Sequence, residues 1–108
     1  MCRALKVLCV AEDSAALAEL KRAAVSAEWE LAPGATAPDE AIRQLHEERP
    51  HVVVAFGAFE GFVARALEAY PALRVVTDRD MPGAGAIVGS LEEVRSAVSG
   101  RSRPGPVR

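Results

Sequence analysis

The chain has 108 residues and a mass of 11.4 kDa, which gives room for one domain. Half of the residues are hydrophobic, which excludes a disordered chain. The net charge of -2 leaves no basic surplus for nucleic-acid phosphates, so we do not expect nucleic-acid binding. No apolar run approaches the roughly 20 residues of a membrane helix and no secretion signal opens the chain, so we expect a cytoplasmic protein without membrane contact.

The first half of the chain predicts two strand–helix units. Residues 6–10 form an apolar run that is typical of a strand covered on both faces. A capped amphipathic helix follows, which we expect to extend from residue 13 to about 27. Residues 28–32 alternate charged and apolar side chains, as in an edge strand, and we expect the tryptophan there to pack on the preceding helix. A proline then opens a second helix over 38–49.

The second half continues the alternation. Residues 51–56 are the most strand-like segment and predict the central strand, and residues 59–70 carry a clear helical stripe of apolar side chains. Strands are expected at 73–77 and 86–88. The last helix starts near residue 90 with the Ser-Leu-Glu-Glu pattern of a capping box.

This order of elements predicts an α/β fold, a three-layer sandwich around a five-stranded parallel sheet. The common strand order for such a sheet is 2-1-3-4-5. We expect one domain over 1–100 and a flexible tail over 101–108, which is rich in proline and glycine. Cys2 and Cys9 are expected to be reduced thiols, with Cys9 in the core.

Several polar residues follow the carboxyl ends of the predicted strands. Open parallel sheets bind ligands at that edge, and clustered carboxylate oxygens suit a hard cation such as Mg²⁺. Ordinary structural roles explain the same residues, with one aspartate capping a helix and the later ones lying in solvated turns. The residues leaving this edge are Glu12, Asp13, Phe56, Gly57, Thr77, Asp78, Arg79, Asp80, Gly89 and Ser90.

Four segments, 6–13, 47–54, 69–76 and 90–94, resemble the response-regulator receiver domain of two-component signalling. They read Lys-Val-Leu-Cys-Val-Ala-Glu-Asp, Glu-Glu-Arg-Pro-His-Val-Val-Val, Ala-Tyr-Pro-Ala-Leu-Arg-Val-Val and Ser-Leu-Glu-Glu-Val. Each segment suits any doubly wound domain, and their order and spacing carry the match. The resemblance implies a flavodoxin-like, CheY-like receiver fold.

Receivers accept a phosphoryl group on an aspartate after the third strand. They bind Mg²⁺ on an acidic pair after the first strand and place a hydroxyl and a lysine at the ends of the fourth and fifth. By this resemblance Glu12 and Asp13 match the acidic pair, and Thr77 matches the hydroxyl. Phe56 falls on the acceptor position and Gly89 ends the fifth strand, where the lysine would stand. Since a phenyl ring has no nucleophile, aspartyl phosphate cannot form there, and we expect no cofactor beyond weak Mg²⁺ binding.

A second departure concerns the connection over 78–85, which contains a helix in receivers. Its eight residues are rich in glycine and proline and predict a loop. Without a helix, apolar sheet surface beside the fifth strand would be uncovered. We therefore expect a homodimer that forms through the edge of the fifth strand.

An alternative alignment places the acceptor at Asp78, because Asp78-Arg79-Asp80-Met81-Pro82-Gly83 resembles the D-x-x-M-P-G that follows the acceptor in many receivers. Residues 71–77 would then be the third strand.

The sequence thus favours a non-enzymatic pseudo-receiver that binds protein partners without phosphorylation. One alternative is a working single-domain receiver phosphorylated on Asp78 or another edge carboxylate. The other is a small-ligand sensor that uses the acidic edge around Arg79.

Overall fold

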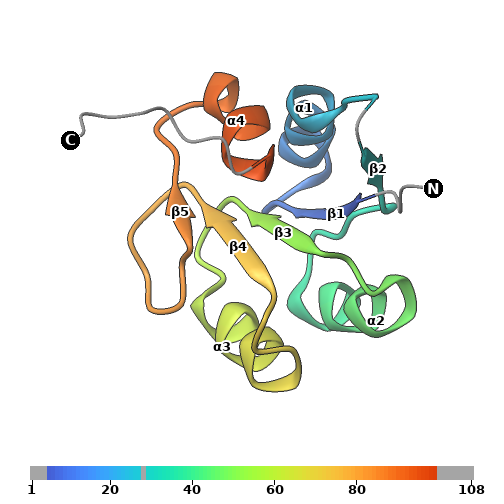
Figure 1. The fold of residues 1–108 in the computed structure, drawn as a ribbon, viewed down its shortest axis with the longest axis vertical. Coiled ribbons are helices and arrows are strands. Elements are labelled where there is room, and N and C mark those ends of the chain that lie inside the picture. The colour runs from blue at the N-terminus through green and yellow to red at the C-terminus, as the bar shows by residue number, and fades with distance from the viewer. Residues whose placement is uncertain (1–4, 28, 100–108) are drawn as a thin grey trace.

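Strands and helices alternate along the chain as far as β4, and β5 follows β4 without a helix between them (Figure 1). The structure, a computed structural model, describes residues 5–27 and 29–99. Cys2 and the tail expected at 101–108 lie outside these residues. The elements are β1 (Leu5–Val10), α1 (Ser14–Ala24), β2 (Trp29–Leu31), α2 (Pro38–Glu48), β3 (Val52–Ala55), α3 (Glu60–Ala69), β4 (Arg74–Thr77), β5 (Ala86–Ile87), the short 3-10 helix η1 (Leu91–Glu93) and α4 (Val94–Ser99).

The five strands form one parallel sheet in the order β2-β1-β3-β4-β5, which confirms the predicted topology. α1 and α4 cover one face of the sheet, and α2 and α3 cover the other (Figure 1). The central strands β1 and β3 need cover on both faces because their apolar residues are continuous rather than alternating. All four residues of β3 are buried, as expected for a central strand.

Alternate residues of the central strands build two separate cores. Leu8 and Val53 belong to the apolar cluster on the α2 and α3 side. Cys9 and Val54 belong to the cluster on the α1 and α4 side. Burial raises the pKa of the Cys9 thiol to about 12, so Cys9 stays protonated as a small core residue, as predicted.

α1 ends at Ala24, so the helix predicted to reach residue 27 is too long. Val25 leaves the helical conformation, and side chains from β2 and α4 bond two carbonyls at this helix end. Trp29 Nε1 donates to the Ala24 carbonyl at 2.7 Å, and Arg95 Nε donates to the Val25 carbonyl at 2.8 Å. The Trp29 ring is therefore buried against α1, as predicted. These contacts satisfy two carbonyl groups that the helix itself leaves unpaired.

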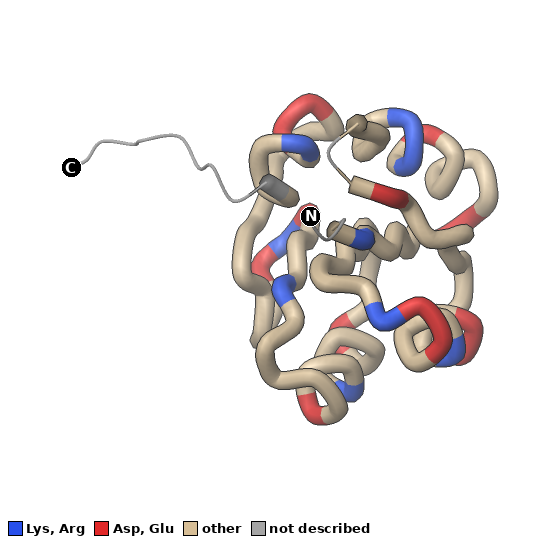
Figure 2. Tube along the Cα trace, turned by 45° about the vertical axis from the view of Figure 1, so that its right-hand side comes forward, with Lys and Arg blue, Asp and Glu red and all other residues tan. Residues whose placement is uncertain are grey.

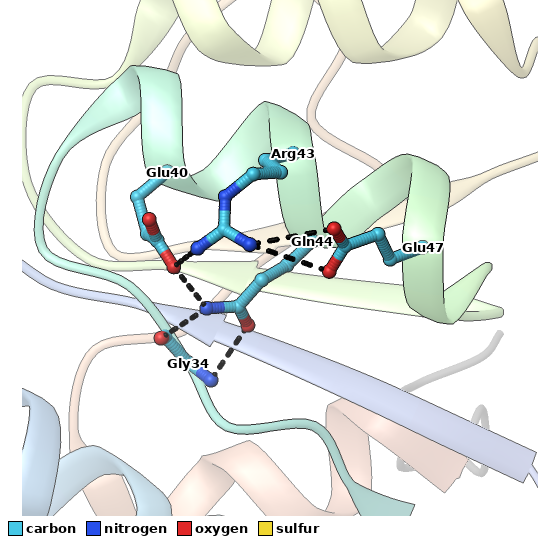
Figure 3. A network of polar contacts seen from close by, with 5 residues as sticks. All are labelled: Gly34, Glu40, Arg43, Gln44 and Glu47. Atoms are coloured by element: carbon cyan, nitrogen blue, oxygen red, sulfur yellow. Dashed lines mark hydrogen bonds and ion pairs between the residues drawn. The ribbon is translucent and has the colours of Figure 1, made fainter.

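The segment that follows β2 lies along the carboxyl end of β1. Ala35 pairs with Val10, and the side-chain amide of Gln44 both accepts from the Gly34 N–H at 2.9 Å and donates to the Gly34 carbonyl at 2.7 Å (Figure 3). Gly34 has a φ of +92°, a conformation that favours glycine. The Gln44 amide also donates to Glu40 at 3.0 Å. These bonds hold α2 to the segment that lies along the carboxyl end of β1.

Charged residues of α2 surround this amide. Arg43 contacts Glu40 one turn earlier and pairs with Glu47 one turn later at 3.3 Å (Figure 3). Over the described part of the trace, basic and acidic residues are interspersed (Figure 2). Pairs of this kind on an exposed helix contribute little individually to stability.

A loop without helix joins β4 to β5, as predicted, but it covers more of the sheet than expected. Met81 is buried in the core cluster on the α3 side, and Gly83 packs so closely on α3 that a Cβ there would lie 2.5 Å from Leu67 Cδ1. The expectation of a bare apolar surface is therefore largely wrong, because Met81 takes the place of a helix side chain. What remains exposed is Ile87, at 52%.

The last helix starts differently from the prediction. Ser90 makes no side-chain capping bond, and Glu93 accepts from the Gly89 N–H at 2.8 Å rather than from Ser90. The expected capping box is therefore wrong in detail, and the first turn is the 3-10 helix η1. Among the helices in the described part of the chain, none has the length and apolar character needed to cross a bilayer.

Candidate functional site

The candidate site lies where β1, β3 and β4 end. In the sheet register Val10 pairs with Ala55, and Ala55 pairs with Thr77, so the three segments that follow begin side by side. These segments are 11–13, 56–58 and 78–80. This is the edge at which open parallel sheets bind ligands, and the prediction that these segments meet there is confirmed.

Glu12 bends over the turn that follows β3. Its Oε2 accepts from the Ala58 N–H at 3.2 Å. Gly57 has a φ of +127°, and a Cβ on it would lie 2.6 to 2.8 Å from Glu12 Cγ, Cδ and Oε2. The close approach of the Glu12 carboxylate therefore requires glycine at 57. Glu12 is engaged in holding this turn.

Asp13 is a helix cap. Its Oδ1 accepts from the Ala16 N–H at 2.8 Å, and its backbone is extended, as is usual for the residue before a helix. The structural role that the sequence allowed for Asp13 is thus confirmed.

Asp78 contacts both the turn after β3 and the adjacent residue Arg79. Its Oδ1 accepts from the Gly57 N–H at 3.2 Å and from Arg79 Nε at 3.2 Å. The hydrogen bond to Asp78 raises the pKa of the Arg79 guanidinium, and the charges of Asp78, Glu12 and Glu60 raise it further. Arg79 therefore places a fixed positive charge among three carboxylates.

The alternative alignment with an acceptor at Asp78 is wrong. Asp78 follows β4, which lies one strand away from the central β3, and residues 74–77 are the fourth strand rather than the third.

Among the described residues, Thr77, Asp80 and Gly89 make no hydrogen bond with the side chains of the network of Glu12, Asp78 and Arg79. The Thr77 side chain is buried and its hydroxyl donates to the Arg79 carbonyl at 2.6 Å, which folds the chain back after β4. Asp80 is exposed, and in the described part of the chain no hydrogen bond or ion pair joins it to this network. Gly89 lies two residues after β5, and its N–H donates to Glu93 Oε1 at 2.8 Å.

Phe56 directly follows the last residue of β3. Its N–H donates to the Val10 carbonyl at 2.9 Å, which continues the pairing of β3 with β1 by one residue. The ring is partly buried and packs against the apolar cluster beneath α1 and α4. The tip of the central strand thus carries an apolar ring.

The four carboxylates expected to gather at this edge do not form a metal site. No group of three or more metal-ligating side chains is found among the described residues. Glu12 and Asp78 accept from consecutive backbone N–H groups, Asp13 caps α1, and Arg79 already supplies a cation. Mg²⁺ at this edge would therefore have to compete with the N–H groups and the guanidinium that these carboxylates already contact.

Sequence reasoning missed the role of the turn over 57–58. Two consecutive N–H groups there meet two carboxylates from the segments that follow β1 and β4, an arrangement that uses the anion-binding character of such turns. The signal available was a glycine directly after the central strand, with acidic residues after both neighbouring strands.

A second region of interest lies at the other side of the sheet, along β5. A hollow of about 350 Å³ opens between β5 and the η1–α4 segment. Its lining includes Arg74, Ala86, Ile87, Glu92, Glu93 and Ala97. β5 has a strand neighbour on one side only, so it is an edge strand.

No protein-family model matches the sequence, and no curated protein matches it. Solved structures do resemble the fold. A CheY-like response regulator receiver domain from Methanospirillum hungatei JF-1 superposes with a TM-score of 0.75 at 14% identity, over 92% of this chain and 94% of the other. The chemotaxis response regulator CheY4 of Vibrio cholerae gives 0.71 at 16% identity, over 92% and 98%. HP1043, an orphan response regulator of H. pylori, gives 0.71 at 14% identity, over 92% and 97%. The chain therefore has the receiver fold.

Proposed function

We propose that this chain is a phosphorylation-independent pseudo-receiver, a protein-interaction module in signalling or regulation that catalyses no reaction and acts through homodimerisation. The observation that carries the proposal is Phe56 at the tip of β3. On a receiver fold that position takes the phosphoryl group, and a phenyl ring offers no oxygen nucleophile to form the new P–O bond.

The surrounding residues support the same conclusion. A phosphoryl group arriving at this edge would need Mg²⁺ or another cation to balance its charge. The carboxylates that would hold the metal are engaged by the turn over 57–58 and by the α1 N-terminus. The Thr77 hydroxyl, matched by resemblance to the receiver hydroxyl, donates to the Arg79 carbonyl instead.

The partner surface of the proposal is the edge of β5. Ile87 is one of two large apolar side chains that the described residues leave exposed, and it lines the hollow beside η1 and α4. β5 is short and unpaired on its outer side. An apolar side chain on an open sheet edge favours association with another chain.

The two alternatives meet specific difficulties. A receiver phosphorylated on Asp78 would have to break the bonds from Asp78 to Gly57 and Arg79. A ligand sensor at the acidic edge would have to displace Arg79 from the same carboxylates.

The phosphorylation claim is tested by incubation with acetyl phosphate and Mg²⁺, followed by intact-mass spectrometry. We expect an unchanged mass. A stoichiometric phosphoryl adduct would contradict the proposal, and its loss in Asp78→Asn would establish the working receiver instead. In parallel, thermal shifts with nucleotides and metabolites test the sensor. A rise in Tm that Arg79→Ala abolishes would favour it.

The dimer claim is tested by sedimentation equilibrium of the wild type and Ile87→Asp. We expect a dimer that the charged side chain converts to a monomer, because a buried unpaired carboxylate is costly. Val25→Asp is the matched control, since Val25 at the end of α1 is 51% exposed and does not line the β5 hollow. It should remain dimeric. A monomeric wild type, or equal loss in both variants, would contradict the β5 interface.

A further inference from the structure

We propose that the hollow beside β5 binds residues 100–108 of the same chain, with Arg103 paired with Glu92. The bound segment covers Ile87, the apolar side chain through which the proposed dimer forms, so the segment and a second copy compete for one surface. The docking is independent of the proposed function, whereas the competition rests on it.

The segment over 100–108 begins close to the hollow. Ala97 of α4 lines the hollow and α4 ends at Ser99, so the segment starts three positions beyond a lining residue. Glu92 also lines the hollow and lies seven residues before the end of α4, about 11 Å along the helix axis. An extended chain covers that length in about four residues. A segment that turns back beside α4 therefore brings Arg103 level with Glu92.

The residue types of the segment suit such a return. Gly100 directly follows the last residue of α4, and glycine is the residue that most readily takes the left-handed conformation that reverses the chain after a helix. Pro104 cannot continue a helix, and it favours an extended conformation at the preceding residue, Arg103. The sequence thus favours a reversal at 100 followed by an extended stretch.

The charges of the segment and of the hollow are complementary. The segment contains three arginines and no acidic residue. Two carboxylates and one guanidinium line the hollow, so negative charge is in excess there. Glu93 already accepts from the Gly89 N–H, whereas no side-chain hydrogen bond or ion pair is found for Glu92 within residues 5–27 and 29–99. Glu92 is therefore the carboxylate that is available to an arginine of the segment.

The lining of the hollow also offers apolar surface. Ile87 is 52% exposed, and Ala86 and Ala97 line the same hollow. The aliphatic stem of an arginine covers apolar surface while its guanidinium reaches a carboxylate. One docked segment therefore removes Ile87 from water and gives Glu92 a partner at the same time.

The short connection to α4 makes weak contacts sufficient. A segment joined to its site by a short linker has an effective concentration on the order of 1 mM. An exposed ion pair and one half-exposed isoleucine give a weak intrinsic affinity, and a dissociation constant of about 1 mM would fill half of the hollows. Dimerisation through Ile87 requires both protomers to release the segment, so half occupancy raises the dimer Kd about fourfold.

Amide NMR spectra of the 108-residue chain test the docking, in solution dilute enough for sedimentation equilibrium to show a monomer. We expect Arg103→Glu to move the amide signals of Ile87 and Ala97 toward their positions in a chain that lacks residues 100–108. Arg108→Glu is the matched control, because it makes the same charge change five residues farther along the segment. It should leave both signals close to wild type.

Charge exchange tests the pairing of Arg103 with Glu92. The heteronuclear NOE of the Ser102 amide rises when the segment is docked, so it should fall in Arg103→Glu and in Glu92→Arg and recover in the double variant. Glu68→Arg, on the exposed side of α3, controls for net charge and should keep the wild-type NOE. Circular dichroism checks folding. If Glu92→Arg unfolds, the comparison of Arg103→Glu with Arg108→Glu decides the question, since both changes lie beyond α4.

The outcomes separate the docking from the proposed dimer. Equal effects of Arg103→Glu and Arg108→Glu, or hollow signals that ignore removal of residues 100–108, overturn the docking and leave the dimer standing. A Ser102 NOE that falls on dilution means that the segment binds a second copy, which overturns docking within one chain.

Sedimentation equilibrium then tests the competition. Arg103→Glu should lower the dimer Kd about fourfold and Arg108→Glu should leave it unchanged. Equal Kd values for wild type and Arg103→Glu overturn the competition. A wild type that stays monomeric at every concentration overturns the dimer and the competition together, while the NMR signals still decide the docking.

Discussion

The carboxyl edge at β1, β3 and β4 and the outer edge at β5 differ in how their polar groups are used. At the first, Glu12 and Asp78 hold two consecutive N–H groups, and Arg79 balances the acidic charge. At the second, Arg74 and Glu92 find no side-chain partner among the described residues, and Ile87 is half exposed. At the carboxyl edge the polar side chains are occupied by contacts within the chain, whereas at the outer edge of β5 they are available to a partner.

The two edges therefore differ in what a ligand or partner would have to displace. A buried or shared carboxylate must lose its present partners before it can bind a ligand, which lowers the affinity by the energy of those contacts. Charges without a side-chain partner and an exposed apolar side chain give up only their contacts with water when a partner binds. Binding is therefore expected at β5, and the predictions below test how firmly the other edge is closed.

The largest expected effect comes from opening the turn after β3. Gly57→Ala should lower the free energy of unfolding by about 2 kcal/mol, because alanine is strained at a φ of +127° and its Cβ would displace Glu12. Denaturant unfolding measures the change. Gly61→Ala is the control, since nothing lies within 4 Å of a Cβ there and the residue is inside α3, so a gain of about 0.5 kcal/mol is expected. Equal stability of the two variants would refute the close packing of Glu12 on Gly57.

A smaller effect is expected from Asp13. Asp13→Ala should cost about 1 kcal/mol through loss of the bond to the Ala16 N–H, whereas Asp13→Asn keeps an N-cap oxygen and should cost much less. Urea unfolding with and without Mg²⁺ measures both variants. The account of Asp13 as a cap requires the same loss in both conditions. A loss that appears only with Mg²⁺ would mean that Asp13 is a metal ligand.

The smallest effect is expected from Arg79. Arg79→Ala should slightly lower Tm at low salt, because Asp78, Glu12 and Glu60 lose their nearby positive charge, and the difference should vanish at high salt. Arg79→Lys keeps the charge and should lie between. Thermal melts at two salt concentrations measure it. A Tm difference that persists at high salt would show that Arg79 acts through packing instead.

The fold was predictable because its signals are local. The apolar run at 51–56 and the stripe at 59–70 depend only on the period of side chains along one segment, and both elements appear in the structure. The alternation of strands and helices then leaves few topologies. Helix ends were harder. α1 stops at Ala24, where Trp29 and Arg95 bond the carbonyls of Ala24 and Val25, and the contact of Arg95 comes from 70 residues away, which no local pattern encodes.

The sequence was enough to predict where the site residues lie, but not which groups their side chains contact. Topology brings Glu12, Phe56 and Asp78 to one edge, and the sequence shows that Phe56 has no nucleophile. Whether a carboxylate binds a metal, a guanidinium or a backbone N–H depends on distances set by packing across three strands. The covering role of Met81 is hidden for the same reason, since the loop that carries it has no periodic pattern.

The most direct test measures the oligomeric mass of the wild type by sedimentation equilibrium, with and without beryllofluoride and Mg²⁺. A surface that works independently of phosphorylation predicts the same dimer, with the same Kd, in both conditions. A Kd that changes when the phosphoryl mimic is added would mean that the carboxyl edge still receives the signal, and would contradict the account.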